Sequence, residues 1–128
     1  MPTAKKETIL IVEDSELQRE AAHSIIESLG YTRILQAKDG VEAMEHLSKN
    51  KVDLIISDLE MPGMNGLELL AEVRNSPEHK TIPFIMLTIF DDKEKIVQAA
   101  KSGVSDYIIK PIERNTLKVR LKRIFGNQ

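Results

Sequence analysis

Four short runs of Ile, Leu and Val recur along the chain, and each of them is too brief to form a helix. They occupy residues 8–12, 52–56, 83–87 and 107–109. Because their apolarity is continuous rather than alternating, we predict strands that are buried on both faces of a sheet. A fifth segment, residues 32–37, mixes Thr, Arg and Gln with apolar residues, so we place it at an edge of the sheet.

Segments with helical spacing of apolar residues separate these runs. The first begins at Ser15, with Gln18 three residues later in the spacing of a capping box, and ends at Gly30. Its expected apolar stripe is Leu17, Ala21, Ile25 and Leu29. The other four stripes are Val41, Met44 and Leu47, then Leu67, Leu70 and Val73, then Ile96, Ala99 and Ala100, and finally Leu117, Leu121 and Ile124.

The order of these segments, strand and helix alternating five times, determines the predicted fold class. It indicates an α/β protein with a doubly wound five-stranded parallel sheet and five flanking helices, distributed over both faces. With the mixed segment at one edge, the strand order is 2-1-3-4-5 by analogy with flavodoxin-like proteins.

Length and charge limit what such a chain does. Its 128 residues, 41% of them hydrophobic, suit one domain spanning residues 1–128. A net charge of −2 argues against direct nucleic-acid binding, and the absence of cysteine excludes thiol chemistry. No segment has the apolar length of a signal peptide or a membrane span, so we expect a cytoplasmic protein that does not contact membranes.

Three carboxylates follow the predicted strands at their carboxyl ends. Glu13 and Asp14 come after the first strand, and Asp58 comes after the third. In the predicted strand order these ends flank the crevice where the order reverses, so the three side chains share one pocket. Neighbouring carboxylates repel one another unless a cation joins them, which predicts a hard divalent metal, Mg²⁺, with oxygen ligands.

Two further polar residues end the fourth and fifth strands at the same edge. Thr88 ends the fourth strand and offers a hydroxyl, while Lys110 ends the fifth and offers a positive charge. These groups suit the oxygens of a phosphoryl group during transfer. Asp58 is the most central of the carboxylates, so it is the best candidate for the nucleophile.

Four separated motifs in register now indicate a family. IVEDS at 11–15, SDLEMPGMNGLELL at 57–70, LT at 87–88 and DYIIKP at 106–111 resemble the receiver domain of two-component response regulators, as in chemotaxis regulators. The resemblance extends over essentially the whole chain. It implies a phosphoacceptor switch in a phosphorelay rather than an enzyme acting on an external substrate.

The resemblance also implies a role for each matched residue. Asp58 would accept a phosphoryl group from a phosphohistidine on a histidine kinase or a phosphotransfer protein. Mg²⁺ would be held by Asp14, by Asp58, by the backbone carbonyl of Glu60 and, through water, by Glu13. Thr88 and Lys110 would contact the phosphoryl oxygens.

Other matched positions concern the switch and access to the site. Tyr107 matches the switch aromatic residue of the family, and the bond before Pro111 is expected to be cis. Ile89 departs from the pattern, because receivers mostly carry Ala or another small residue there. We expect its bulk to obstruct the phosphodonor and the hydrolytic water. Glu60 and Phe90 occupy the other positions that tune hydrolysis in the family.

Charge near the end of the chain suggests a surface for partners. The last helix carries Arg114, Lys118, Arg120, Lys122 and Arg123, whereas Asp91 and Asp92 open the fourth helix. In receivers this face commonly docks targets, and opposite charges there permit a receiver dimer or an acidic partner. The output target stays open.

Two alternatives to the switch are considered. The first is a Mg²⁺-dependent phosphohydrolase with an aspartyl-phosphate intermediate, which uses similar carboxylates. Dehalogenase-like phosphohydrolases, however, carry Asp-x-Asp on the first strand and a cap domain, and this chain has neither. The second is a pseudo-receiver that only binds partners, which disagrees with the presence of Asp58, Thr88 and Lys110.

Overall fold

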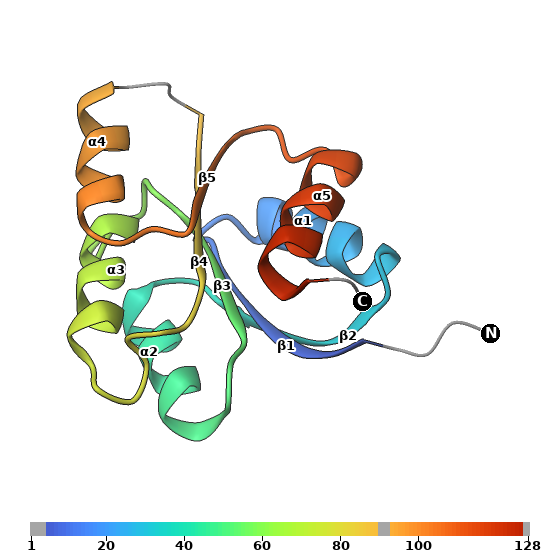
Figure 1. Ribbon diagram of the computed structural model, residues 1–128, viewed down its shortest axis with the longest axis horizontal. Helices are drawn as coiled ribbons and strands as arrows, with labels where there is room; N and C mark the ends of the chain where they lie inside the picture. Colours follow the sequence, from blue (N-terminus) through green and yellow to red (C-terminus); the bar gives the residue numbers. More distant parts are fainter. Residues whose placement is uncertain (1–4, 90–92, 127–128) are drawn as a thin grey trace.

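The structure is a computed structural model that describes residues 5–89 and 93–126. Within these residues five strands alternate with five helices (Figure 1). Their bounds are β1 (Lys5–Val12), α1 (Glu16–Ser28), β2 (Tyr31–Ala37), α2 (Gly40–Lys49), β3 (Leu54–Asp58), α3 (Gly66–Asn75), β4 (Phe84–Thr88), α4 (Lys93–Lys101), β5 (Asp106–Ile109) and α5 (Arg114–Phe125). None of these helices is both long enough and apolar enough to pass through a bilayer.

The strands form one parallel sheet in the order β2-β1-β3-β4-β5. Helices α1 and α5 cover one face of this sheet, and α2, α3 and α4 cover the other (Figure 1). The predicted fold class and strand order are therefore confirmed. Because the chain moves from β1 outward to β2 and then back past β1 to β3, a crevice opens between the carboxyl ends of β1 and β3.

Burial follows the position of each strand in the sheet. All residues of β3 and β4 are buried, as are the last four residues of β1. In contrast, β5 is an edge strand, and Ile109 is 49% exposed. The expectation that 107–109 is buried on both faces is therefore wrong, because the flanking helices cover an edge strand less completely than a central strand.

The predicted apolar stripe of the first helix is wrong at its amino-terminal end. Leu17 is 82% exposed and Ala21 is exposed, whereas Ile25 is half-buried and Leu29 is buried. Residues four apart rotate by roughly 40° per step around an α-helix, so a stripe of this spacing leaves the core progressively. Ala22 and Ile26 occupy the buried positions instead.

The same error occurs in α2, where Val41 was expected to face the core. Val41 is 66% exposed, and Ala43 and Leu47 provide the buried contacts. In α4 the expected Ala100 is also exposed, while Ala99 is buried. Single positions were thus assigned to the wrong face, although every predicted helix is present.

Candidate functional site

The site lies at the carboxyl edge of the sheet. Glu13 and Asp14 directly follow β1, Asp58 is the last residue of β3, Thr88 is the last residue of β4, and Lys110 directly follows β5. All five residues occupy the strand ends to which the sequence assigned them. Parallel strands therefore deliver every polar group of the candidate site to the same edge.

Three carboxylates meet in the crevice between β1 and β3. Oxygen atoms of Glu13, Asp14 and Asp58, one from each residue, lie within 4.8 Å of one another. Glu13 is 4% exposed and Asp58 is 7% exposed, whereas Asp14 is exposed. Partial burial raises the pKa of Asp14 above its usual value, and the hydrogen bond and the charge of Glu13 raise it further.

This donor set fits a magnesium ion. It consists only of oxygen ligands, which hard divalent cations prefer, and it provides too few of them for a complete protein shell. Burial, and then the neighbouring Glu13, disfavour the charged form of Asp14 in the absence of a cation. A bound divalent cation would favour that charged form.

Lys110 provides the positive charge beside the acceptor candidate. Its Nζ lies 2.8 Å from Glu13 Oε1 and 3.2 Å from Asp58 Oδ1. The backbone N–H of Lys110 also donates to the carbonyl of Thr88 over 2.6 Å, which joins the ends of β5 and β4. The peptide bond that follows, between Lys110 and Pro111, is cis.

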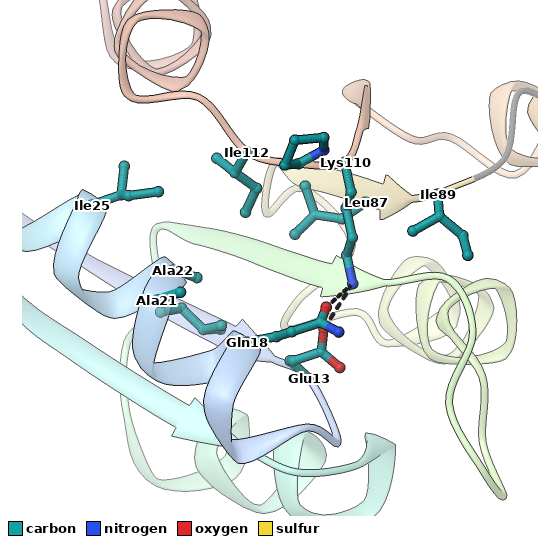
Figure 2. Close-up of a pocket in the computed structure, with 11 residues that line it drawn as sticks. Glu13, Gln18, Ala21, Ala22, Ile25, Leu87, Ile89, Lys110 and Ile112 are labelled. Atoms are coloured by element: carbon teal, nitrogen blue, oxygen red, sulfur yellow. Dashed lines mark hydrogen bonds and ion pairs between the residues drawn. The ribbon is translucent and has the colours of Figure 1, made fainter.

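Sequence reasoning missed one residue of this site. Gln18, on the first turn of α1, accepts a hydrogen bond from Lys110 Nζ at its Oε1 over 2.6 Å (Figure 2). Its position three residues after Ser15 suggested a capping role instead. The backbone N–H of Gln18 does donate to Ser15 Oγ, but its side chain turns to Lys110. Only the tertiary contact between α1 and the end of β5 reveals that Gln18 belongs to the site.

The backbone around Asp58 is held closely on the side of α3. The N–H of Leu59 donates to the carbonyl of Leu87 over 2.7 Å, and the N–H of Gly66 donates to the carbonyl of Leu59 over 3.0 Å. A Cβ atom on Gly66 would lie only 2.4 Å from the carbonyl oxygen of Asp58, so glycine is needed there. This close approach fixes the turn that carries the acceptor candidate.

The remaining residues that the sequence assigned to the site lie farther from the carboxylates. Tyr107 is half-buried and packs against the core on the side of α2 and α3. The Glu60 side chain is exposed and forms an ion pair with Lys95 of α4. Phe90, Asp91 and Asp92 lie outside the described residues, so the structure does not address their predicted roles.

An apolar cavity adjoins the site between α1 and the chain after β5 (Figure 2). Its volume is about 410 Å³, and Ile25 and Ile112 are among its apolar lining residues. Ile89 also lines it and is 64% exposed. Glu13, Gln18 and Lys110 form its polar end, so the cavity opens directly onto the ammonium group.

Comparison with known proteins agrees with this geometry. The sequence model of the response regulator receiver domain matches residues 9–122. The chain is 38% identical over 121 residues to chemotaxis protein CheY-3 of Vibrio cholerae, and the aligned residues cover 94% of this chain and 93% of that protein. It is 40% identical over 119 residues to CheY1 of Helicobacter pylori, with 92% and 96% of the two chains covered. The chain therefore belongs to the response regulator receiver domain family.

Solved structures of receiver domains resemble the whole fold. The receiver domain of a histidine kinase from Syntrophus aciditrophicus is 39% identical, with a TM-score of 0.86 and 94% and 91% of the chains covered. The receiver domain of a sensor histidine kinase from Pseudomonas aeruginosa is 28% identical, with a TM-score of 0.86 and 96% and 100% covered. That second structure contains a magnesium ion coordinated in its active site cleft. The chain is thus a phosphoacceptor signalling domain of the two-component type.

Proposed function

We propose that Asp58 is the phosphoacceptor and that its donor is a phosphohistidine on a histidine kinase or a phosphotransfer protein. The observation that carries this proposal is the position of Asp58, which is a buried member of the acidic cluster with Lys110 Nζ 3.2 Å from its Oδ1. A carboxylate beside a fixed cation can attack phosphorus while the cation stabilises the charge that develops on the phosphoryl oxygens.

The transfer conserves atoms and charge. An oxygen of Asp58 forms a bond to phosphorus while the bond between phosphorus and the donor imidazole nitrogen breaks. The electron pair of that bond returns to the imidazole ring, which takes up a proton from solvent. In hydrolysis, water forms a bond to phosphorus, the bond between phosphorus and the Asp58 oxygen breaks, and inorganic phosphate leaves, which regenerates Asp58. The domain would thus assist its own phosphorylation and dephosphorylation without turning over an external substrate.

Asp14 and Asp58, with the backbone carbonyl of Glu60 and with Glu13 through water, would hold the magnesium ion. When bound, this ion neutralises charge on the carboxylates and on the incoming phosphoryl oxygens. Lys110 is the positively charged side chain of the protein that would also neutralise charge on the phosphoryl oxygens. Its ammonium contacts Gln18 of α1 and lies 3.2 Å from Asp58 Oδ1, so it is held beside the acceptor candidate.

The output of the switch would arise at Thr88 and Tyr107. Contact of the phosphoryl group with the Thr88 hydroxyl and with Lys110 would shift an equilibrium between two surfaces. Tyr107 would move with Thr88 because their strands are adjacent: Thr88 pairs with Ile109, and Tyr107 pairs with Met86. The face of α4, β5 and α5 would then bind an output target or a second receiver. A cytoplasmic location and a domain spanning 1–128 remain predictions.

The test is a labelling experiment with magnesium and a phosphorylated histidine kinase. We expect one phosphate per chain, stable in acid and labile in base, and no labelling of the Asp58→Asn variant. The Asp53→Asn variant is a matched control, since Asp53 is at the opposite, amino-terminal end of β3 and accepts a hydrogen bond from the backbone of Thr8. Label that survives Asp58→Asn would contradict the assignment of the acceptor.

A further inference from the structure

The Gln18 side chain forms the shortest contact of the Lys110 ammonium. The distance from Nζ to Gln18 Oε1 is 2.6 Å, compared with 2.8 Å to Glu13 Oε1 and 3.2 Å to Asp58 Oδ1. An ammonium group has three N–H donors. Two of them therefore serve Gln18 and Glu13, and the third is available on the side of Asp58, where the phosphoryl group would arrive.

Gln18 differs from the other two acceptors in its charge. Glu13 and Asp58 are carboxylates that belong to the candidate metal cluster, so a bound cation would share them with Lys110. The amide of Gln18 is neutral and is not one of the three carboxylates of that cluster. It can therefore keep holding the ammonium group, and it fixes the position of Lys110 without neutralising the charge that the phosphoryl oxygens need.

The first turn of α1 is built so that the Gln18 side chain is free for this contact. In a complete capping box the side chain three residues after the cap bonds back to the backbone N–H of the cap residue. Here the backbone N–H of Ser15 donates to Glu13 Oε2 over 3.2 Å instead. The chain does form a complete capping box at Asn65 and Glu68, where both reciprocal bonds are present. Gln18 is thus released from a role that Glu68 retains.

We propose that Gln18 is a positioning residue for phosphoryl transfer, which holds the Lys110 ammonium beside Asp58 from the first turn of α1. This inference rests on the proposed function of Asp58 and Lys110. Its contribution is geometric, because an unanchored lysine has several rotatable bonds and reaches the phosphoryl oxygens only part of the time. Gln18 acts through Lys110 and need not touch the phosphodonor.

The main test is the Gln18→Met variant, which keeps side-chain length and helix propensity but removes the acceptor. Gln98→Met is the matched control, because Gln98 is an exposed glutamine of α4. Each protein is phosphorylated with phosphoramidate over a range of donor and magnesium concentrations. The NMR signal of the Lys110 ammonium, assigned by its loss in Lys110→Met, reports how fast its protons exchange with water.

We expect Gln18→Met to lower the maximal phosphorylation rate about five- to tenfold, while the half-saturating magnesium concentration stays within about twofold. Ammonium exchange should become faster in Gln18→Met and stay slow in Gln18→Glu, which retains an acceptor. In a Lys110→Met background, Gln18→Met should have no further effect on the rate.

The outcomes separate the two proposals. If wild-type protein is phosphorylated on Asp58 neither by the phosphorylated histidine kinase nor by phosphoramidate, the proposed function fails. If it is phosphorylated and Gln18→Met matches wild type in rate and in ammonium exchange, the role of Gln18 is overturned. A rate that falls equally in the presence and in the absence of Lys110 would also overturn it, because Gln18 would then act independently of that residue.

Discussion

Lys110 donates a hydrogen bond to Glu13 across 2.8 Å, although the two residues are 97 positions apart in the sequence. Their side chains are only 13% and 5% exposed. The contact joins the chain after β5 to the chain after β1 on the α1 side of the crevice. It also places a fixed positive charge next to the carboxylates that would bind magnesium.

Lys110 and a magnesium ion should therefore compete for the same carboxylates. Replacing Lys110 by Met removes the repulsion between the ammonium and the ion and releases Glu13, so we expect magnesium to bind about fivefold more tightly. Isothermal titration calorimetry of the Lys110→Met variant measures this change. Lys51→Met, at an exposed position just before β3, should leave the affinity as it is. Weaker binding by Lys110→Met would show that the two cations do not compete.

The raised pKa of Asp14 predicts how magnesium binding depends on pH. Burial and the neighbouring Glu13 favour the protonated form of Asp14, so the folded state binds this proton more tightly than the unfolded state does. Its contribution to folding stability is present below the ordinary pKa of 3.8 and is lost as the pH rises through the raised value. Magnesium binds the deprotonated form of Asp14, so magnesium affinity should decrease on acidification. Because the pKa is raised, this decrease should begin at a higher pH than it would with an ordinary aspartate.

The variant Glu13→Gln separates the causes of this shift. It removes the charge of Glu13 but leaves the burial of Asp14, so the pKa of Asp14 should fall only part of the way to its ordinary value. An NMR titration of the Asp14 carboxyl carbon without magnesium measures the pKa of Asp14 in wild type and in Glu13→Gln. Glu45→Gln, an exposed position of α2, serves as the control. An unchanged pKa in Glu13→Gln would contradict the role of Glu13.

The sheet and most of the site could be predicted from the sequence, whereas the buried faces of the helices and one site residue could not. Continuous apolar runs with polar residues at their ends determine a parallel sheet and one functional edge, so Asp58 and Lys110 could be placed before any coordinates. Helix faces were less predictable, because the four-residue spacing of Leu17, Ala21 and Ile25 rotates around the helix axis and leaves the core at its amino-terminal end. Gln18 could not be found, because it is on a helix rather than at a strand end and its spacing from Ser15 indicated a cap.

Ile89 is expected to slow the loss of the phosphoryl group. Its β-branched side chain lines the same cavity as Lys110 and is 64% exposed, and at this place its bulk would hinder the approach of water to the acyl phosphate. We expect Ile89→Ala to hydrolyse about threefold faster, and to be labelled faster by small phosphodonors. The control is Val41→Ala, a residue of 66% exposure on α2. Equal phosphate lifetimes for Ile89→Ala and wild type would exclude this effect.

Arg74 connects three segments on the side of α3. Its guanidinium donates to the carbonyls of Gly103, Lys80 and Ile82 over 2.9, 3.1 and 2.7 Å. Lysine cannot reproduce this fork, so Arg74→Lys should lower the free energy of unfolding by about 2 kcal/mol. Urea denaturation measures the change, and Arg33→Lys, an exposed position on β2, should differ little from wild type. A loss in Arg74→Lys no larger than that of the control would mean that the three bonds contribute little.

Tyr31 should make the protein sensitive to alkali. Tyr31 is 2% exposed, and the centroid of its ring lies 5.9 Å from the centroid of the Phe125 ring. Burial, and to a smaller extent the charge of Glu7, raises its pKa from 10.0 to about 12. In the folded state the phenol therefore keeps its proton at a pH where the unfolded chain has lost it. This contribution to stability is complete below pH 10.0 and is lost as the pH rises through about 12.

Within that window the free energy of unfolding should fall by up to about 1.4 kcal/mol per pH unit because of this one group. Urea denaturation between about pH 9 and pH 11.5 measures the slope, and Tyr31→Phe retains the ring without the titrating hydroxyl. The slope of the variant should be shallower than that of wild type by this amount. The phenolate absorbance of wild type that Tyr31→Phe lacks should appear near pH 12. Parallel slopes for the two proteins, or absorbance of Tyr31 near its ordinary pKa, would show that burial of the ring does not shift its titration.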